Sequence, residues 1–306
     1  MSDNIVEIGN PARLSVRDAQ LVIEREGFLP FATPVSGVTA LLLAHPQVTL
    51  TQAVFSRLAE AGAIVVTIDS QYRPAAMSVP LQANTLQSER IAAQASLSPV
   101  RRKQLWTQIV KAKIRSQANL LRELYGSDGG LEPMRRRVRS GDPDNMEAQA
   151  ARRYWGLIFD DKSFRRGAEQ EAQSRDQNRH LDYGYTVLRA TVARALCATG
   201  LHPSLGLRHH NRYDPFCLVA DLMEPFRPLI DRRVVLWVRE HDPSAPLDSP
   251  TKKWLIQGVT MRYLCNGEQR AFPDIVARAA SSLAAAIVGQ ESRVELPEAL
   301  GPCPDE

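Results

Sequence analysis

Two acidic residues lie three positions apart in a segment that is otherwise apolar, FCLVADLMEPF. Asp221 and Glu224 would share one face of a helix, where neighbouring carboxylates repel each other and are rarely buried without a partner. A divalent cation would compensate both charges, because hard cations bind carboxylate oxygens. The alternative is an ion pair with an arginine such as Arg227 or Arg232, and the spacing alone favours that alternative.

Two adjacent histidines, His209 and His210, precede this segment. Imidazole is a good ligand for ions such as manganese, so a histidine beside carboxylates indicates a catalytic metal more than a structural calcium. Neighbouring side chains on a chain point in different directions. At most one of the two histidines is therefore expected to bind a metal.

A third acid, Glu147, lies one turn into a helix that is predicted to begin at Pro143, with Asp142 as its cap. The helix dipole alone explains an acid at this place. Alanines at positions 148, 150 and 151 also leave room for a bulky group to approach the carboxylate. Glu147 is therefore a candidate ligand for a metal that a substrate can reach.

Motifs of nucleotide hydrolysis and of serine catalysis are absent. The sequence contains no GxGxxG, no GxxxxGK[ST] and no GxSxG. Phosphate-binding loops of the common kinds and a serine nucleophile elbow are thus excluded.

The positive charge is concentrated in the middle of the chain. Residues 1–90 carry a net charge of −2, residues 91–240 carry +9 and residues 241–306 carry −3, which sum to the overall +4. A section this basic indicates a polyanion such as nucleic acid as a partner, or else a solvated helical surface rich in arginine. The same two alternatives hold for the long helix predicted at 98–125, and the solvated surface is slightly favoured. The basic residues of this helix lie outside its apolar stripe and are Arg101, Arg102, Lys103, Lys111, Lys113, Arg115 and Arg122.

The elements that must position these residues divide the chain into two main parts, as expected for 306 residues. Residues 1–90 are predicted as a β-rich domain, with buried strands at 38–43 and 63–68 and one helix at 49–61. Residues 91–97 are predicted as a linker, 98–290 as a helical catalytic domain and 291–306 as a flexible tail. The helix that starts near residue 216 should kink or stop at Pro225 and Pro228. The predicted fold class is therefore α+β, with a small amino-terminal β-rich domain followed by a larger, all-helical catalytic domain.

Four strings in this order resemble a known family: NMEAQAARRY at 145–154, NRHLDYGY at 178–185, GLHPSLGLRHHN at 200–211 and DLMEPFRP at 221–228. They are similar to CRISPR-associated protein one, the metal-dependent endonuclease and integrase of spacer acquisition, in its type II form. The resemblance implies that Glu147, His209 and Glu224 hold the metal and carry the catalysis. It places Asp221 and Asn178 behind these ligands in supporting roles.

The resemblance also implies the reaction and the partners. Spacer DNA is inserted into a CRISPR array when a 3′-hydroxyl group attacks a phosphodiester at the repeat boundary, with magnesium or manganese as the cofactor. Expected partners are double-stranded DNA of the spacer precursor and the repeat, a second copy of the chain bound through the β-rich domain, CRISPR-associated protein two and the large type II effector nuclease. Candidates for contacts with the DNA backbone are Arg135, Arg136, Arg137, Arg152 and Arg153.

Two other functions compete with this one. In the first, a non-catalytic helical protein binds or scaffolds DNA, and its acids only pair with arginines. In the second, a metal-dependent hydrolase acts on small molecules, which the arginine excess disfavours. The four cysteines form no CxxC pair and the amino terminus has acids where a signal peptide needs an apolar run, so the expected location is the cytoplasm.

Overall fold

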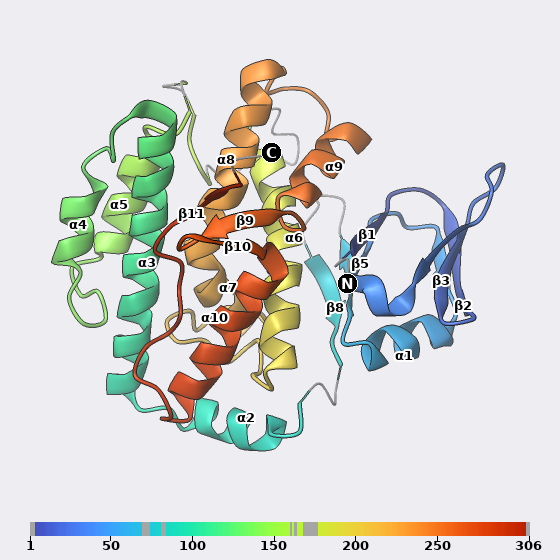
Figure 1. Ribbon diagram of the computed structural model, residues 1–306, viewed down its shortest axis with the longest axis horizontal. Helices are drawn as coiled ribbons and strands as arrows, with labels where there is room; N and C mark the ends of the chain where they lie inside the picture. Colours follow the sequence, from blue (N-terminus) through green and yellow to red (C-terminus); the bar gives the residue numbers. More distant parts are fainter. Residues whose placement is uncertain are drawn as a thin grey trace.

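The computed structural model describes residues 4–68, 74–80, 84–159, 161, 164–167 and 177–303. A small β-rich part, which begins with the blue amino-terminal strands, lies beside a larger body of helices (Figure 1). The residues that the sequence marks for chemistry all lie in the larger body.

Two four-stranded sheets make up the β-rich part. One has the order β1-β5-β7-β8, in which β8 is antiparallel to β7 and the other pairs are parallel. The other has the order β4-β3-β2-β6. Helix α1 (Gln52–Glu60) lies within the helix predicted at 49–61, whose first two residues belong instead to strand β6. The remaining elements are β1 (Asn4–Ile8), β2 (Ala12–Arg17), β3 (Gln20–Glu24), β4 (Phe31–Pro34), η1 (Val35–Gly37), β5 (Val38–Leu43), β6 (Val48–Leu50), β7 (Ile64–Ile68) and β8 (Pro74–Ser78).

Strands β5 and β7 confirm the two predicted buried strands, and their packing explains why both sequences are mostly apolar. Leu42 and Val66 pack into the core of the helical body, whereas Leu41 and Val65 pack into the core of the β-rich part. Successive side chains of a strand point to opposite faces. One sheet therefore contributes to both cores and holds the β-rich part against the helical body.

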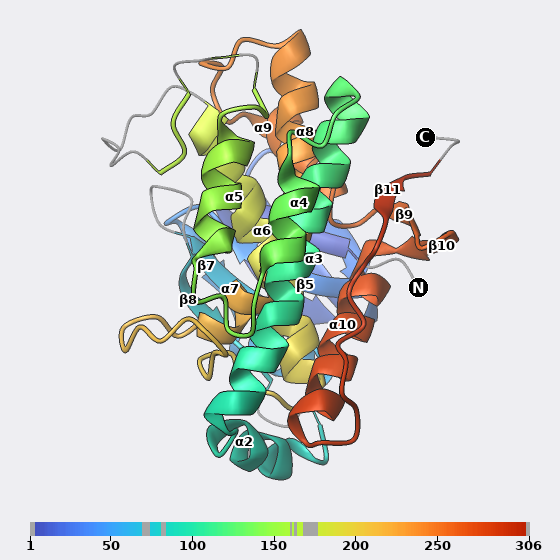
Figure 2. The ribbon, with the colours of Figure 1, turned by 90° about the vertical axis from the view of Figure 1, so that its left-hand side faces the viewer.

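The helical body is built around α6, most of whose residues are buried. Helices α3, α4 and α5 run side by side on one flank of it (Figure 2). Helix α3 begins as predicted, since Ser98 Oγ accepts the N–H of Arg101 at 3.2 Å and Pro99 occupies the first turn, and it ends at Gly126 with φ 73°. The helices are α2 (Gln87–Ala95), α3 (Pro99–Tyr125), α4 (Leu131–Arg137), α5 (Met146–Trp155), α6 (Gln177–Ala198), α7 (Cys217–Met223), η2 (Glu224–Phe226), α8 (Arg227–Glu240), α9 (Ser249–Gln257) and α10 (Phe272–Ile287).

The prediction of an all-helical second domain is wrong, because this part contains a three-stranded sheet. The sheet is antiparallel, with the order β10-β9-β11, and consists of β9 (Arg262–Cys265), β10 (Glu268–Ala271) and β11 (Leu300–Pro302). Asn266 and Gly267 join β9 to β10 with φ of 51° and 88°. An Asn-Gly pair with two positive φ angles is the turn that two-residue hairpins prefer. The fold remains α+β, but β-structure occurs at both ends of the chain.

Two other segments are more ordered than the sequence indicates. Helix α2 covers most of the stretch predicted as a linker, and β11 lies in the stretch predicted as a flexible tail. Val294 and Cys303 of that stretch are buried. Hydrogen bonds of Val294, Glu295 and Glu298 therefore hold this stretch against α3 and α10, and β11 holds it against β9.

All four cysteines are buried and none forms a disulfide. Among the described helices, none has the length and apolarity that crossing a bilayer requires.

Candidate active site

The helix that carries Asp221 and Glu224 is interrupted by prolines, as predicted. A single 3-10 turn, η2, separates α7 from α8. Pro225 and Pro228 have no N–H group, so the carbonyls four residues earlier lack the usual helical partner. Glu224 therefore lies at a junction between two helices, and both acids are almost completely buried, at 0% and 5% exposure.

Asp221 anchors the loop that carries the histidines. Its Oδ2 accepts the backbone N–H of Leu207 at 2.5 Å and of Arg208 at 3.1 Å. Its Oδ1 lies 2.6 Å from Nδ1 of His209 and accepts the N–H of the same residue at 3.3 Å. These contacts hold the loop, and among the described residues no arginine side chain forms an ion pair with Asp221.

Gly206 allows this close approach. A Cβ atom at this position would lie 2.4 Å from the carbonyl oxygen of His209 and 3.0 Å from Oδ2 of Asp221. Any other residue would push the loop away from the carboxylate. Gly206, the second glycine of the GLHPSLGLRHHN string, is thus required by packing.

The ring of His209 is oriented by Asp221. An ionised carboxylate only accepts hydrogen bonds, so Nδ1 of the imidazole carries a proton, and in the neutral ring Nε2 keeps its lone pair for a ligand. The hydrogen bond to Asp221 raises the pKa of His209, against the effect of burial. The ring packs edge to face on Trp106, with centroids 5.9 Å apart.

Glu147 and Glu224 converge on one ammonium group. Nζ of Lys113, on α3, contacts Oε1 of Glu147 and lies 2.6 Å from Oε2 of Glu224. The other oxygen of Glu224 lies 3.0 Å from Nε of Arg227. Glu147 is fixed at the start of α5, where the carboxylate of Asp142 accepts its N–H at 2.9 Å.

The charges of this cluster are balanced by its two cations. Burial on its own would raise the pKa of Glu224, but Arg227 and Lys113 outweigh it and hold the pKa at about 2. Burial would lower the pKa of Lys113, but Glu224 and Glu147 outweigh it and raise the pKa. At neutral pH the carboxylate and the ammonium are therefore both ionised.

A pocket of about 390 Å³ opens beside these groups. Glu147 and His209 both line it, whereas Glu224 lies behind them, 5% exposed. The remaining lining residues are Trp106, Asp142, Asn145, Arg208, His210, Asn211 and Asp214. A ligand that enters the pocket meets one of the two carboxylates and the imidazole directly.

The donor set suits a divalent ion, although its members are not closed around one. Among the residues that the structure describes, no three His, Cys, Asp or Glu side chains form a group ready to hold a metal. Two carboxylates nevertheless share one cation, which lies 2.6 Å from the buried Oε2 of Glu224. Carboxylate oxygens with an imidazole are the donors that magnesium and manganese accept. The residues present therefore fit such an ion.

A buried polar network lies beside Arg227. Its guanidinium lies over the ring of Tyr185, at 4.7 Å from the centroid, and the Tyr185 hydroxyl donates to Asp231. Arg166 lies over the same ring at 5.3 Å and donates to Asn178 at 2.9 Å. Asn178 is thus connected to the acids through Arg166, Tyr185 and Arg227.

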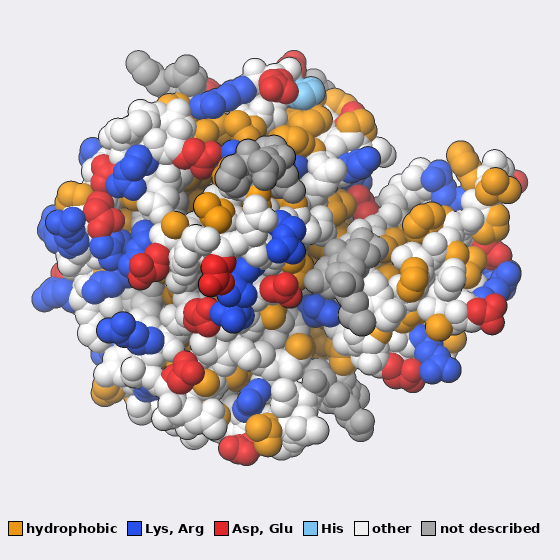
Figure 3. Space-filling view, in the orientation of Figure 1, with side chains coloured by type: hydrophobic (Ala, Val, Ile, Leu, Met, Phe, Trp, Pro, Cys, Tyr) orange, Lys and Arg blue, Asp and Glu red, His pale blue; other side chains and the backbone are white. Residues whose placement is uncertain are grey.

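The arginines expected to contact DNA lie on α4 and α5. Arg135 and Arg136 pair with Glu132, at 3.7 Å for Arg136, while Arg153 donates to the carbonyl of Gly129. Arg136, Arg137 and Arg152 are exposed. Basic side chains gather over these helices at the left edge of the molecule (Figure 3). The alternative partner for the acids, Arg232, pairs instead with Glu123 at 2.6 Å.

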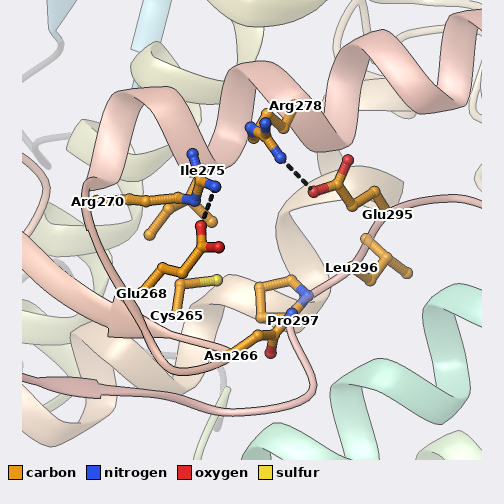
Figure 4. A pocket seen from close by; sticks show the side chains of 9 residues that line it. All are labelled: Cys265, Asn266, Glu268, Arg270, Ile275, Arg278, Glu295, Leu296 and Pro297. Atoms are coloured by element: carbon orange, nitrogen blue, oxygen red, sulfur yellow. Dashed lines mark hydrogen bonds and ion pairs between the residues drawn. The ribbon is translucent and has the colours of Figure 1, made fainter.

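A second pocket, of about 180 Å³, lies far along the chain from these residues, between the β9–β10 hairpin, α10 and the segment before β11 (Figure 4). Its charged side chains neutralise each other, since Arg270 pairs with Glu268 and Arg278 with Glu295 at 2.9 Å. It offers no unbalanced charge to a ligand.

Lys113 is the residue of this cluster that the sequence alone does not single out. The sequence predicts it as one of the solvent-facing cations of its helix, yet it is 8% exposed. Its spacing contained the signal, because Leu105, Ile109 and Lys113 follow one another at four-residue intervals and so share the apolar face. A charge on such a face needs an opposite charge next to it.

The fold and the site define an α+β protein with two carboxylates, a histidine and two cations gathered at a surface pocket. The model of the family CRISPR associated protein Cas1 matches residues 6–245. The chain is 33% identical over 299 residues to the CRISPR-associated endonuclease Cas1 of Neisseria meningitidis serogroup C (strain 8013), covering 96% of this chain and 95% of the relative. The chain therefore belongs to the Cas1 family.

Solved structures share the fold at lower identity. A casposase bound to integration product superposes with a TM-score of 0.76 and 16% identity, over 97% of this chain and 93% of that one. A chain of a Cas6-RT-Cas1–Cas2 complex superposes with a TM-score of 0.72 and 16% identity, over 97% of this chain and 36% of that longer one. The family resemblance inferred from the four strings is confirmed, while the assignment to the type II form stays a prediction.

Proposed function

We propose that this protein is a metal-dependent DNA endonuclease and integrase that inserts spacer DNA into a CRISPR array. The observation that carries the proposal is the convergence of Glu147 and Glu224 on one cation, beside a pocket that His209 also lines. Membership of a family whose curated relative is named an endonuclease supports it.

In the proposed reaction, a 3′-hydroxyl oxygen of the incoming DNA forms a bond to phosphorus at the repeat boundary while the bond to the departing 3′-oxygen breaks. One phosphodiester replaces another, and the proton of the attacking hydroxyl ends on the departing oxygen. No nucleotide hydrolysis is needed, in agreement with the absence of phosphate-binding loops. A bound magnesium or manganese ion would supply charge for the phosphate oxygens.

The residues of this chain have separate tasks. Glu147, His209 and Glu224 would hold the ion, with Asp221 fixing the tautomer of His209 and Arg227 balancing the buried charge of Glu224. The pocket admits a phosphate from the side of Glu147 and His209. Asn178 would act one step further back, through Arg166.

Partners follow from the same proposal. Structures of related fold contain a casposase with its integration product and Cas1 together with Cas2. We accordingly propose DNA and CRISPR-associated protein two as partners. From the family resemblance of the four strings we further propose a homodimer formed through the β-rich part and contact with the large effector nuclease of type II systems.

The test is a strand-joining assay. The purified chain, with its CRISPR-associated protein two, is mixed with a labelled duplex and a plasmid that carries a repeat array. Joined product is expected in magnesium or manganese and is expected to vanish when a chelator removes the ion. Joining at full rate in the chelator would contradict the metal dependence.

One observation favours the competing function. Glu224 does pair with Arg227, as a protein with purely structural acids would show. A non-catalytic DNA-binding scaffold would bind the duplex tightly and join nothing under any metal condition, which the same assay would reveal.

Exposed arginines on α4 and α5 should set the affinity for DNA. We expect a variant with alanine at Arg136, Arg137 and Arg152 to bind any duplex more weakly and to lower the salt slope, d log K/d log [salt], by about 3, because each lost phosphate contact removes about one unit. Fluorescence anisotropy between 50 and 200 mM salt, roughly the range where such contacts matter, measures this. Alanine at Arg17 and Arg57, on the β-rich part and paired with Glu24 and Glu60, is the control. An unchanged slope would remove these arginines from the DNA interface.

A further inference from the structure

The ammonium group of Lys113 lies between two carboxylates, those of Glu147 and Glu224, and its position is the shared point of these acids. Its ammonium group contacts Glu147 and lies 2.6 Å from Glu224, and its side chain is 10% exposed. A buried ammonium is stable only with charged partners, and here both partners come from other elements, α5 and η2. The lysine therefore fixes the distance between the two carboxylates.

Neutralising Glu224 does not require this lysine. Arg227 already pairs with Oε1 of Glu224, while Lys113 approaches the other oxygen, Oε2. Among the ion pairs of the described residues, the ammonium of Lys113 is the group that both acids share. The position of the ammonium between the two acids therefore needs an explanation, because Arg227 could balance the charge of Glu224 without Lys113.

The contact with Glu224 is ionic and open to exchange. Oε2 of Glu224 is buried, and the partner beside it is the ammonium of Lys113 at 2.6 Å, a charged group on a flexible side chain. The partner acid Glu147 lines the pocket, with 26% of its side chain exposed. A cation that enters through the pocket can therefore reach the shared point from the solvent side.

We propose that Lys113 is an internal substitute for the divalent ion: its ammonium holds Glu147 and Glu224 together while the site is empty of metal and leaves the shared point when the ion binds. This inference rests on the proposed function, because it assumes that the two acids are ligands. A charge of +1 is exchanged for one of +2 at the same carboxylates, and the flexible stem of the lysine allows the ammonium to withdraw.

The exchange makes Lys113 a competitor of the metal. Removing its charge should therefore tighten metal binding rather than weaken it. We expect Lys113→Met to bind Mn²⁺ on the order of tenfold more tightly than the wild type in the absence of DNA. The variant should also be less stable without the ion and gain more in Tm when Mn²⁺ is added.

The experiment is a Mn²⁺ titration of the full-length chain without DNA, followed by electron paramagnetic resonance and by thermal unfolding. Lys111→Met is the matched control, because Lys111 lies on the same helix but faces a groove away from the acids. Lys113→Gln, which is neutral but can still donate to both acids, is a second variant if Lys113→Met is too unstable. Glu147→Gln shows whether the bound ion is at this site.

The outcomes separate the two proposals. Tighter Mn²⁺ binding in both Lys113 variants, with Lys111→Met like the wild type, supports the exchange. Equal or weaker binding in the Lys113 variants, or a loss of Tm that is the same with and without Mn²⁺, overturns it and leaves the metal site intact. No Mn²⁺ binding by any of the proteins would instead overturn the metal site of the proposed function.

Discussion

A Glu147→Gln variant is expected to lose DNA strand joining by on the order of 10²–10³-fold while keeping its fold. Glu147 is the carboxylate that meets the pocket, so it is the ligand nearest to an incoming phosphate. Glutamine keeps the size and one oxygen of the side chain but removes the negative charge that an ion and Lys113 both need. The ion would be held by fewer charges, and its contribution to the reaction would fall with it.

The matched control is Glu123→Gln. Glu123 is a helical glutamate paired with Arg232 at 2.6 Å, at 38% side-chain exposure and outside the pocket. The joining assay with both variants, together with circular dichroism to verify the fold, gives the comparison. Joining by Glu147→Gln within about threefold of the wild type would remove Glu147 from the site, and the assignment from the NMEAQAARRY string with it.

Local sequence signals predicted the frame of the site well. The prolines at 225 and 228 place a break next to the acids, and the structure has a 3-10 turn there. The Ser98-Pro99 start of α3 is equally local, because capping depends on residues that are neighbours in sequence. Continuous apolar runs likewise predicted β5 and β7, whose two faces are both buried. Where an element depends on residues that are close in sequence, the sequence pattern is sufficient to predict it.

Features that depend on distant segments were not predicted. Strand β11 exists because residues 300–302 pair with β9, more than thirty positions earlier, and nothing in the segment itself indicates that pairing. The β9–β10 hairpin is different, since Asn266-Gly267 is a local turn signal that the helical interpretation of this region overlooked. The prediction of an all-helical second domain is therefore wrong for two reasons. The pairing of β11 has no signal in its own segment, whereas the Asn-Gly turn of the β9–β10 hairpin has one.

The candidate site likewise combines features that the local sequence predicts with features that depend on distant segments. The i,i+3 spacing placed Asp221 and Glu224 on one helical face, but it did not separate their roles. Asp221 points to the backbone of the histidine loop, and Glu224 points to two cations. Lys113 completes the cluster from a helix more than thirty residues before Glu147. Which acid is a ligand and which a support is decided by elements that only the tertiary fold brings together.

Asp221→Asn should therefore reveal the support role by a change in His209. The amide oxygen of asparagine can take the place of Oδ2 and accept the N–H groups of Leu207 and Arg208. The amide NH₂ would then face Nδ1 of His209, where the wild type has a carboxylate oxygen at 2.6 Å. A donor at this place forces the imidazole to accept at Nδ1 and to carry its proton on Nε2, the atom that should bind the ion.

We expect Asp221→Asn to fold, to bind Mn²⁺ about 10–100-fold more weakly and to lose joining by a similar factor. Asp221→Ala removes the acceptor for three backbone N–H groups as well, and should lower the free energy of unfolding by about 3–5 kcal/mol. ¹⁵N chemical shifts of the His209 ring measure the tautomer directly, and urea unfolding measures the stability. If Asp221→Asn leaves the proton on Nδ1 or joins DNA at the wild-type rate, then Asp221 only fastens the loop, and the orientation of His209 does not depend on its charge.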